Sequence, residues 1–296
     1  MLQIELNMYQ AVAVAALVLL LGRFLVSKIP FLTKYCIPEP VVGGVVYAVV
    51  HLILRSAGIL EISFDNTLQS FFMTVFFCSV GYTACFRLLK KGGVQVLLFL
   101  LVSIIMVALQ NGLGAVLAGA FHLDPRLGLA VGSIPMVGGH GTAGAFGPVL
   151  EDFNIKGATT ICTAAATFGL ISGSLVGGPL GKRLIEKRGL LDTAIPEDDT
   201  LLVEDEKKHE RHTNMYAAAV FQLILAIGLG TIFSWLLTKT GMTFPIYIGA
   251  MIAAALFRNI GEYSGKFTIH MGEINDLGGI SLSLFLGIAM ITLKLW

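Results

Sequence analysis

Residues 131–147, with the sequence Val-Gly-Ser-Ile-Pro-Met-Val-Gly-Gly-His-Gly-Thr-Ala-Gly-Ala-Phe-Gly, form an apolar stretch that is poorly suited to a continuous helix. Five glycines between Gly138 and Gly147, together with Pro135, disfavour helical backbone. Broken backbone at membrane depth is tolerated only where it is buried in protein or lines a water-filled cavity. In a membrane protein this stretch therefore predicts a cavity of the kind in which transporters hold substrate.

The composition of the chain is that of an integral membrane protein. Of its 296 residues 55% are hydrophobic and 13% are charged, against about 25% charged in soluble domains. The mean hydropathy is +0.82, and the net charge of +1 gives no support for a nucleic-acid partner. Glu5 lies where a secretory signal would carry basic residues, so no cleaved signal peptide is expected.

Eight apolar segments are long enough to cross a lipid bilayer, which takes about twenty helical residues. They cover residues 8–27, 41–57, 67–86, 94–121, 155–181, 215–238, 244–260 and 276–294. The glycine-rich stretch lies in a further apolar segment at about 125–150. The sequence thus predicts an all-α, multi-pass integral membrane protein.

The basic residues predict how these segments are oriented. Lys and Arg cluster after the first, third and fifth spans, at residues 28–34, 87–91 and 182–188. Because cytoplasmic loops are enriched in these residues, the N-terminus is expected outside and the linker 183–213 in the cytoplasm. A single crossing by residues 125–150 would place that linker outside. The number of membrane crossings before the linker therefore predicts that residues 125–150 form a re-entrant hairpin, which enters and returns from the outer side.

Short motifs recur 207 to 209 residues apart, which indicates an internal repeat. Asn7-Met8-Tyr9 recurs as Asn214-Met215-Tyr216, Ile37-Pro38 as Phe244-Pro245, and Asn66-Thr67-Leu68 as Asn275-Asp276-Leu277. Because the first half starts outside and the second inside, the expected architecture is an inverted-topology repeat. We assign residues 1–182 to a first repeat of five helices with the hairpin, 183–213 to the linker, and 214–296 to a second repeat with three spans, truncated relative to the first.

The hairpin is the predicted substrate and ion site. Where a half-helix begins, its unpaired N–H groups and the positive end of its dipole can hold an anion. The hydroxyls of Ser133 and Thr142 can bond an anion or coordinate Na⁺, and His140 can orient the hairpin, contact substrate or carry a proton. The spans carry almost no charged side chains, which disfavours a carboxylate proton relay. The expected ligand is a small organic anion with Na⁺ as coupling ion. No other cofactor and no bound metal are assigned.

The span that follows the hairpin is a second candidate contributor. Thr163 and Thr167 are four residues apart and share a helix face. Glycines at positions 169, 173, 177 and 178 indicate close helix packing, with a share in the site as the alternative.

Four stretches of the chain resemble the bacterial sodium–glutamate symporter family. These stretches are 34–44 (Lys-Tyr-Cys-Ile-Pro-Glu-Pro-Val-Val-Gly-Gly), 132–142 (Gly-Ser-Ile and Gly-Gly-His-Gly-Thr at its ends), 166–179 (Ala-Thr-Phe-Gly-Leu and Gly-Gly-Pro at its ends) and 281–296 (Ser-Leu-Ser-Leu-Phe-Leu and Leu-Lys-Leu-Trp at its ends). The resemblance covers essentially the whole chain. It implies Na⁺-driven uptake of L-glutamate across the bacterial inner membrane, a homodimer, and elevator-like alternating access. It also implies substrate or ion contacts from Ser133, Gly138, Gly139, His140, Gly141 and Thr142, and further from Thr163 and Thr167.

The chain departs from the family pattern at its end. Family members continue past the position of Trp296 into a second glycine-rich hairpin, so the chain is expected to be C-terminally incomplete. The explanations are a fragment, a second polypeptide that supplies the missing part, or a natural short form.

Three other functions compete with glutamate uptake. The first is Na⁺-coupled transport of a di- or tricarboxylate, and the second is an inactive truncated or regulatory membrane protein. The third is an intramembrane hydrolase that uses Ser133 and His140, but the expected Gly-x-Ser-Gly pattern is absent, since Ile134 and Pro135 follow Ser133. An enzyme is therefore not expected.

Overall fold

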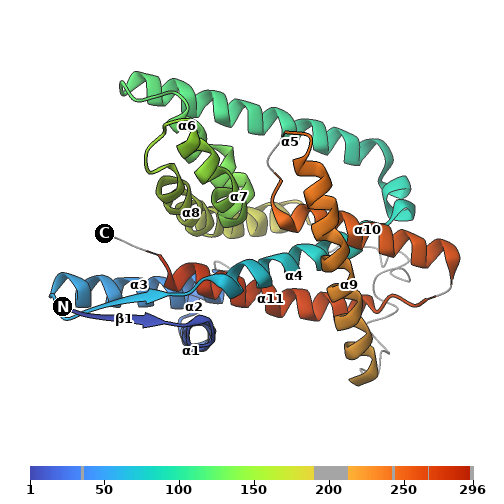
Figure 1. Ribbon diagram of the computed structural model, residues 1–296, viewed down its shortest axis with the longest axis horizontal. Helices are drawn as coiled ribbons and strands as arrows, with labels where there is room; N and C mark the ends of the chain where they lie inside the picture. The colour runs from blue at the N-terminus through green and yellow to red at the C-terminus, as the bar shows by residue number, and fades with distance from the viewer. Residues whose placement is uncertain (35–36, 190–212, 242–243, 266, 294–296) are drawn as a thin grey trace.

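The computed structural model describes residues 1–34, 37–189, 213–241, 244–265 and 267–293 (Figure 1). Helices make up most of the described chain. In chain order the elements are β1 (Leu2–Leu6), α1 (Met8–Lys28), α2 (Pro30–Lys34), α3 (Glu39–Ser56), β2 (Leu60–Phe64), α4 (Thr67–Thr83), α5 (Phe86–Ala120), α6 (Leu127–Val131), α7 (Ser133–Asp152), α8 (Ala158–Lys187), α9 (Thr213–Thr238), α10 (Ile246–Ser264) and α11 (Met271–Ile291).

All eight predicted spans are helices. Among the described residues, α1, α3, α5 from Gly93, α8, α9 and α11 are long and apolar enough to cross a membrane. The other two predicted spans are α4, with 17 residues, and α10, with 19. The prediction of a helical, multi-pass membrane protein is therefore confirmed. The predicted linker 183–213 lies mostly outside the described residues, and α8 extends into its first part.

Two short strands were not predicted. β1 and β2 pair in parallel, with Leu2 opposite Leu60 and Leu6 opposite Phe64. The His51 ring in α3 lies under this ladder, where its Nε2 accepts the N–H of Ile62 at 3.0 Å. The ladder joins the start of the chain to the segment between α3 and α4.

The long helices form two groups, which Figure 1 shows one above the other. Helices α1, α3, α4, α9, α10 and α11 pack together and are called here the six-helix group. Helices α5 to α8 pack among themselves and are called here the hairpin group. Contacts between helices of different groups are sparse. In the six-helix group α4 and α11 run antiparallel, since Ser79 lies against Gly278 while Phe72 packs with Ile288.

Equivalent glycine contacts join the helices of each predicted repeat. α1 and α3 meet at Gly22 and Gly43, where a Cβ on either residue would overlap the backbone of the other helix. α9 and α10 meet in the same way at Gly230 and Gly249. Gly230 follows Gly22 by 208 residues and Gly249 follows Gly43 by 206, close to the offset of the sequence motifs.

The contacts across α4 and α11 follow the same offset. Gly44 of α3 lies against Met290 of α11, and Gly81 of α4 lies against Met251 of α10. Met251 follows Gly44 by 207 residues, and Met290 follows Gly81 by 209 residues. The two contacts are therefore equivalent under the offset of the sequence motifs. The helices α3 and α10 also begin alike, because their N-cap residues Pro38 and Pro245 have the same extended backbone.

Candidate functional site

The backbone of α7 breaks at Gly139 and the chain reverses there. Gly139 has φ 70° and ψ −159°, a conformation that L side chains rarely adopt. The Thr142 hydroxyl donates to the carbonyl of Ile134, eight residues earlier, and lies 3.1 Å from that of Gly139. In a continuous helix, residues eight apart are separated by about 12 Å. Residues 127–139 and 140–152 are therefore two helical arms, called here the first arm and the second arm, that meet at Gly139.

Close contacts favour glycine on both sides of this reversal, at Gly138 and at Gly141. A Cβ on Gly138 would overlap the side chain of Thr142 across the turn. A Cβ on Gly141 would lie 2.6 Å from Sδ of Met73 and 2.9 Å from Cε1 of Tyr247. Met73 belongs to α4 and Tyr247 to α10, so the tip of the hairpin is seated directly on the six-helix group.

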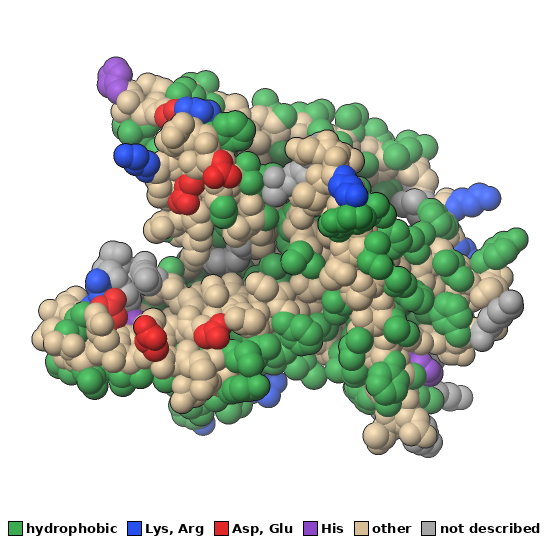
Figure 2. Space-filling model, in the orientation of Figure 1, with side chains coloured by type: hydrophobic (Ala, Val, Ile, Leu, Met, Phe, Trp, Pro, Cys, Tyr) green, Lys and Arg blue, Asp and Glu red, His purple; other side chains and the backbone are tan. Residues whose placement is uncertain are grey.

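A cavity of about 490 Å³ lies between the hairpin group and the six-helix group. In Figure 2 the visible face of the molecule is hollowed between the two groups. The lining residues are glycines and apolar side chains, contributed by both arms, α8, α4 and α11. They are Phe77, Pro135, Met136, Val137, Gly138, Gly139, Gly141, Ala166, Gly169, Leu170, Gly173, Gly177, Gly178, Phe285 and Leu286. The polar groups that these residues can offer to the cavity are therefore backbone N–H and C=O groups.

Three of the predicted site residues line this cavity, namely Gly138, Gly139 and Gly141. His140 lies between them in the chain, and its side chain falls outside the described residues. Thr142 lies at the same turn, but its hydroxyl is engaged with carbonyl groups of the first arm.

The other predicted hydroxyl residues are not among the lining residues. Ser133 is 7% exposed and lies at the start of α7, where its N–H donates to Asn111. Thr167 is buried, and its hydroxyl donates to the carbonyl of Thr163 in the preceding turn. Thr163 is exposed and donates in the same way to Thr159. These two threonines bond to the backbone of their own helix, as such residues commonly do within helices.

Further residues that the sequence did not point to line the candidate cavity. Phe77 of α4 and Phe285 and Leu286 of α11 close the cavity from the six-helix group. Gly173 and Gly177 line it from α8, and each has open space at the position of a Cβ. The glycine stripe of α8 was the available signal, and close packing was its preferred interpretation.

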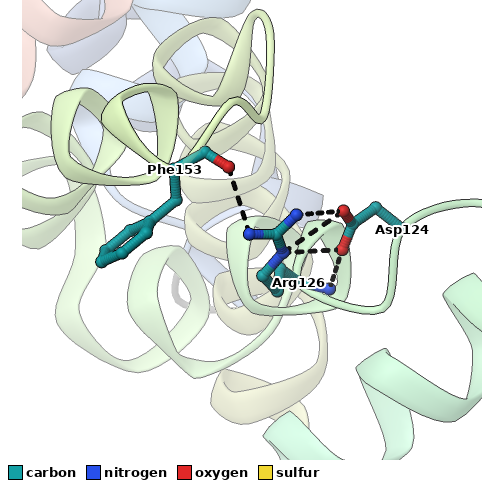
Figure 3. A network of polar contacts seen from close by, with 3 residues as sticks. All are labelled: Asp124, Arg126 and Phe153. Atoms are coloured by element: carbon teal, nitrogen blue, oxygen red, sulfur yellow. Dashed lines mark hydrogen bonds and ion pairs between the residues drawn. The ribbon is translucent and has the colours of Figure 1, made fainter.

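Arg126 lies at the open end of the hairpin, where it pairs with Asp124 and bonds the carbonyl of Phe153 across the opening (Figure 3). Arg126 bonds both carboxylate oxygens of Asp124, the closest approach being 2.6 Å, and its Nη1 donates to the carbonyl of Phe153 at 3.1 Å. Arg126 directly precedes α6, and Phe153 directly follows α7. The side-chain hydrogen bonds from Arg126 lower the pKa of Asp124 to about 2. The contact therefore ties the outer ends of the two arms together.

No group of three His, Cys, Asp or Glu side chains in the described part of the chain is placed to hold a metal ion.

Comparison with known proteins gives a consistent result. The family model for the sodium/glutamate symporter matches residues 4–296. The sodium/glutamate symporter of Escherichia coli (strain K12) is 35% identical over 99% of this chain and 74% of its own length. The sodium/glutamate symporter of Haemophilus influenzae is 35% identical over 97% of this chain and 72% of its own length. No solved structure matches the chain.

Proposed function

The chain belongs to the sodium/glutamate symporter family, and we propose that it takes up L-glutamate with Na⁺ at the cavity beside the hairpin tip. One observation carries the location of the site. The break at Gly139, the reversal made by Thr142 and the cavity wall formed by Gly138, Gly139 and Gly141 coincide in one place.

The hairpin is proposed to be re-entrant, entering the membrane from the outer side. Its two arms are each too short to cross a bilayer, which needs about twenty residues. Cytoplasmic loops are enriched in Lys and Arg. The basic residues after α1, α4 and α8 therefore favour a cytoplasmic linker and an N-terminus outside. A chain that reverses inside the bilayer needs a protein-lined cavity, and this reversal has one.

Substrate recognition is proposed to use the backbone at the hairpin tip. The second arm starts at residue 140, so its first N–H groups lack carbonyl partners within the helix and carry the positive end of the dipole. A glutamate carboxylate could bond these groups, while the apolar side chains around them exclude water and strengthen the attraction. Ser133, His140, Thr163 and Thr167 remain proposed contributors from the family resemblance. Na⁺ is proposed to be coordinated by carbonyl oxygens near Thr142, for which Ile134 and Gly139, whose oxygens also accept the Thr142 hydroxyl, are candidates.

Alternating access is proposed to be a movement of the hairpin group against the six-helix group. The sparse contacts between the two groups favour such a movement, because little packing has to be broken. An inverted-topology repeat is supported by the paired glycine contacts at equivalent positions of α1–α3 and α9–α10. The cavity lies at the boundary where the groups would slide, so each position of the hairpin group could expose it to one side.

The assembly and the location are proposed from the family resemblance. The chain is a multi-pass membrane protein. We propose that it lies in the bacterial inner membrane and acts as a homodimer. A second polypeptide that completes the cavity is the alternative to a cavity formed by this chain alone, and reconstitution with and without such a partner distinguishes the two.

Uptake of labelled L-glutamate into proteoliposomes that contain only this chain tests the proposal. An inward Na⁺ gradient should drive accumulation, and replacing Na⁺ by K⁺ should abolish it. Excess unlabelled glutamate should compete, whereas malate and citrate should not. Competition by malate or citrate instead would indicate the dicarboxylate or tricarboxylate alternative. Absence of uptake that a co-reconstituted partner polypeptide restores would show that the chain needs that partner.

A further inference from the structure

Asn111 in α5 caps the first residue of α7. Its side-chain Oδ1 accepts the N–H of Ser133 at 2.9 Å. The N-cap residue of α7 is Gly132, which has no side chain with which to bond that N–H group. The cap that serine, threonine or asparagine usually supplies from the same chain segment therefore comes from a neighbouring helix.

Glycines bring α5 close enough for this contact. A Cβ on Gly132 would lie 2.7 Å from the carbonyl oxygen of Gly128 and 2.8 Å from Oδ1 of Asn111. One turn further along α5, a Cβ on Gly114 would lie 2.5 Å from the carbonyl oxygen of Gly128 in α6. The backbones of α5 and α6 thus meet directly, and Asn111 lies at the edge of that contact.

Asn111 is surrounded on α5 mainly by side chains that cannot accept a hydrogen bond. Most described side chains of α5 around it are exposed and apolar, such as Leu109 and Leu113. Hydrophobic side chains also gather over α5 in Figure 2. Lipid offers no acceptor for a freed N–H group, so nothing on the lipid side of α5 would replace the Asn111 amide.

We propose that Asn111 is a positioning residue for glutamate uptake, which holds the first arm so that Gly138 and Gly139 stay at the cavity. The inference rests on the proposed function, because it takes the hairpin tip as the substrate site. Ser133 and Gly138 are the two ends of one short helical segment, so a shift at the capped end is carried to the tip. Asn111 itself acts through the arm and is absent from the cavity lining.

Loss of the Asn111 cap should lower the apparent affinity for glutamate and leave the maximum rate of uptake unchanged. If the first arm keeps its position for only about a tenth of the time, apparent affinity falls about tenfold, and saturating substrate restores the population. Asn111→Leu, which has a similar volume and no acceptor, should therefore raise the KM for glutamate about tenfold with little change in the maximum rate. Asn111→Asp keeps a side-chain oxygen acceptor and should restore a KM close to that of the native chain.

The test is Na⁺-driven uptake of L-glutamate over a concentration series in proteoliposomes. Gln110→Leu is the matched control, because it removes a neighbouring amide for which the described part of the chain offers no hydrogen-bond partner. An unchanged KM in Asn111→Leu, an equal rise in Gln110→Leu, or no rescue by Asn111→Asp would overturn the proposal.

A second readout is independent of transport. Val137 lies near the tip of the first arm and is 52% exposed, so a cysteine there reports the position of the arm. In a background without the native cysteines, Val137→Cys should react faster with maleimide when Asn111→Leu is present, and Asn111→Asp should reverse the change. If the native chain shows no Na⁺-dependent uptake, either alone or with a partner polypeptide, the proposed function fails, and the labelling rates still decide whether Asn111 positions the arm. Equal rates in all variants would overturn the inference while leaving the proposed function intact.

Discussion

Gly141 has no room for a side chain because the hairpin tip rests on Met73 and Tyr247. A methyl group at this position would require shifts of both the flexible Met73 side chain and the Tyr247 ring. A branched side chain would overlap further with the ring of Tyr247. That ring is stacked on the ring of Phe77, with 4.4 Å between the ring centroids. We therefore expect Gly141→Ala to reduce glutamate uptake in proteoliposomes and Gly141→Val to abolish it.

Gly144 provides the matched control for this substitution. It lies one turn further along the second arm, and nothing lies within 4 Å of the position of a Cβ. Gly144→Val should retain uptake and should express at the level of Gly141→Val. Normal uptake by Gly141→Val would remove the basis for the seated hairpin tip.

Thr142 provides a second prediction at the scale of single residues. Its hydroxyl bonds across the reversal to Ile134, so Thr142→Val should destabilise the hairpin by about 1 kcal/mol and lower the thermal unfolding temperature. Thr142→Ser keeps the hydroxyl and should behave like the native chain. If the hydroxyl instead coordinates Na⁺, Thr142→Val would raise the Na⁺ concentration needed for half-maximal uptake at an unchanged unfolding temperature.

The glycines that line the candidate cavity could be predicted from the sequence, whereas the directions of the hydroxyl groups could not. Gly138, Gly139 and Gly141 stand out in the sequence because several glycines interrupt an apolar run, and backbone breaks follow from residue type. The direction of a hydroxyl depends on side-chain rotamer and neighbours. Thr163 and Thr167 satisfy their hydroxyls on their own helix, and no sequence pattern distinguishes this from a site facing a cavity.

At the scale of elements, the helices follow from long apolar runs and the strands do not. Each predicted span is a local property of about twenty residues, and each is a helix in the structure. β1 and β2 form a ladder between residues 2–6 and 60–64, so each strand exists through a distant partner. Strand propensity depends on such context, which explains why two five-residue strands were missed.

The ion pair at the open end of the hairpin gives a prediction for pH dependence. Arg126 lowers the pKa of Asp124 from 3.8 to about 2 in the folded protein. Because the folded pKa is depressed, the stabilisation is present above the unfolded value near 4 and is lost as the pH falls towards 2. Between pH 5 and 8 the carboxylate stays ionised in both states. The difference in unfolding temperature between native chain and Asp124→Asn should therefore be constant over that range. A difference that shrinks between pH 8 and pH 5 would contradict this assignment of the pKa.

At the scale of the whole molecule, the sequence predicted a repeat but did not predict the grouping of the helices. Three short motifs at one offset predicted two related units, and paired glycine contacts occur at nearly that offset. That α5 to α8 pack apart from the other helices depends on contacts between segments far apart in the chain. Hydropathy along the chain carries no information on which helices associate, because lipid-facing and helix-facing surfaces are both apolar.

The two groups give the last prediction, which concerns their relative movement. Val45 of α3 and Leu170 of α8 pack against the same buried cluster around Ala48 and Met290, so they are close across the boundary. In a background without native cysteines, Val45→Cys with Leu170→Cys should be joined by a short bifunctional thiol reagent. The cross-link should stop glutamate uptake, because it ties the hairpin group to the six-helix group, and a reducing agent that cleaves it should restore uptake. Leu127→Cys with Ile161→Cys is the control, since both residues pack on one cluster inside the hairpin group. Full uptake by the cross-linked Val45–Leu170 pair would show that transport proceeds without movement between the groups, and loss of uptake in both pairs would show that it requires motion within the hairpin group itself.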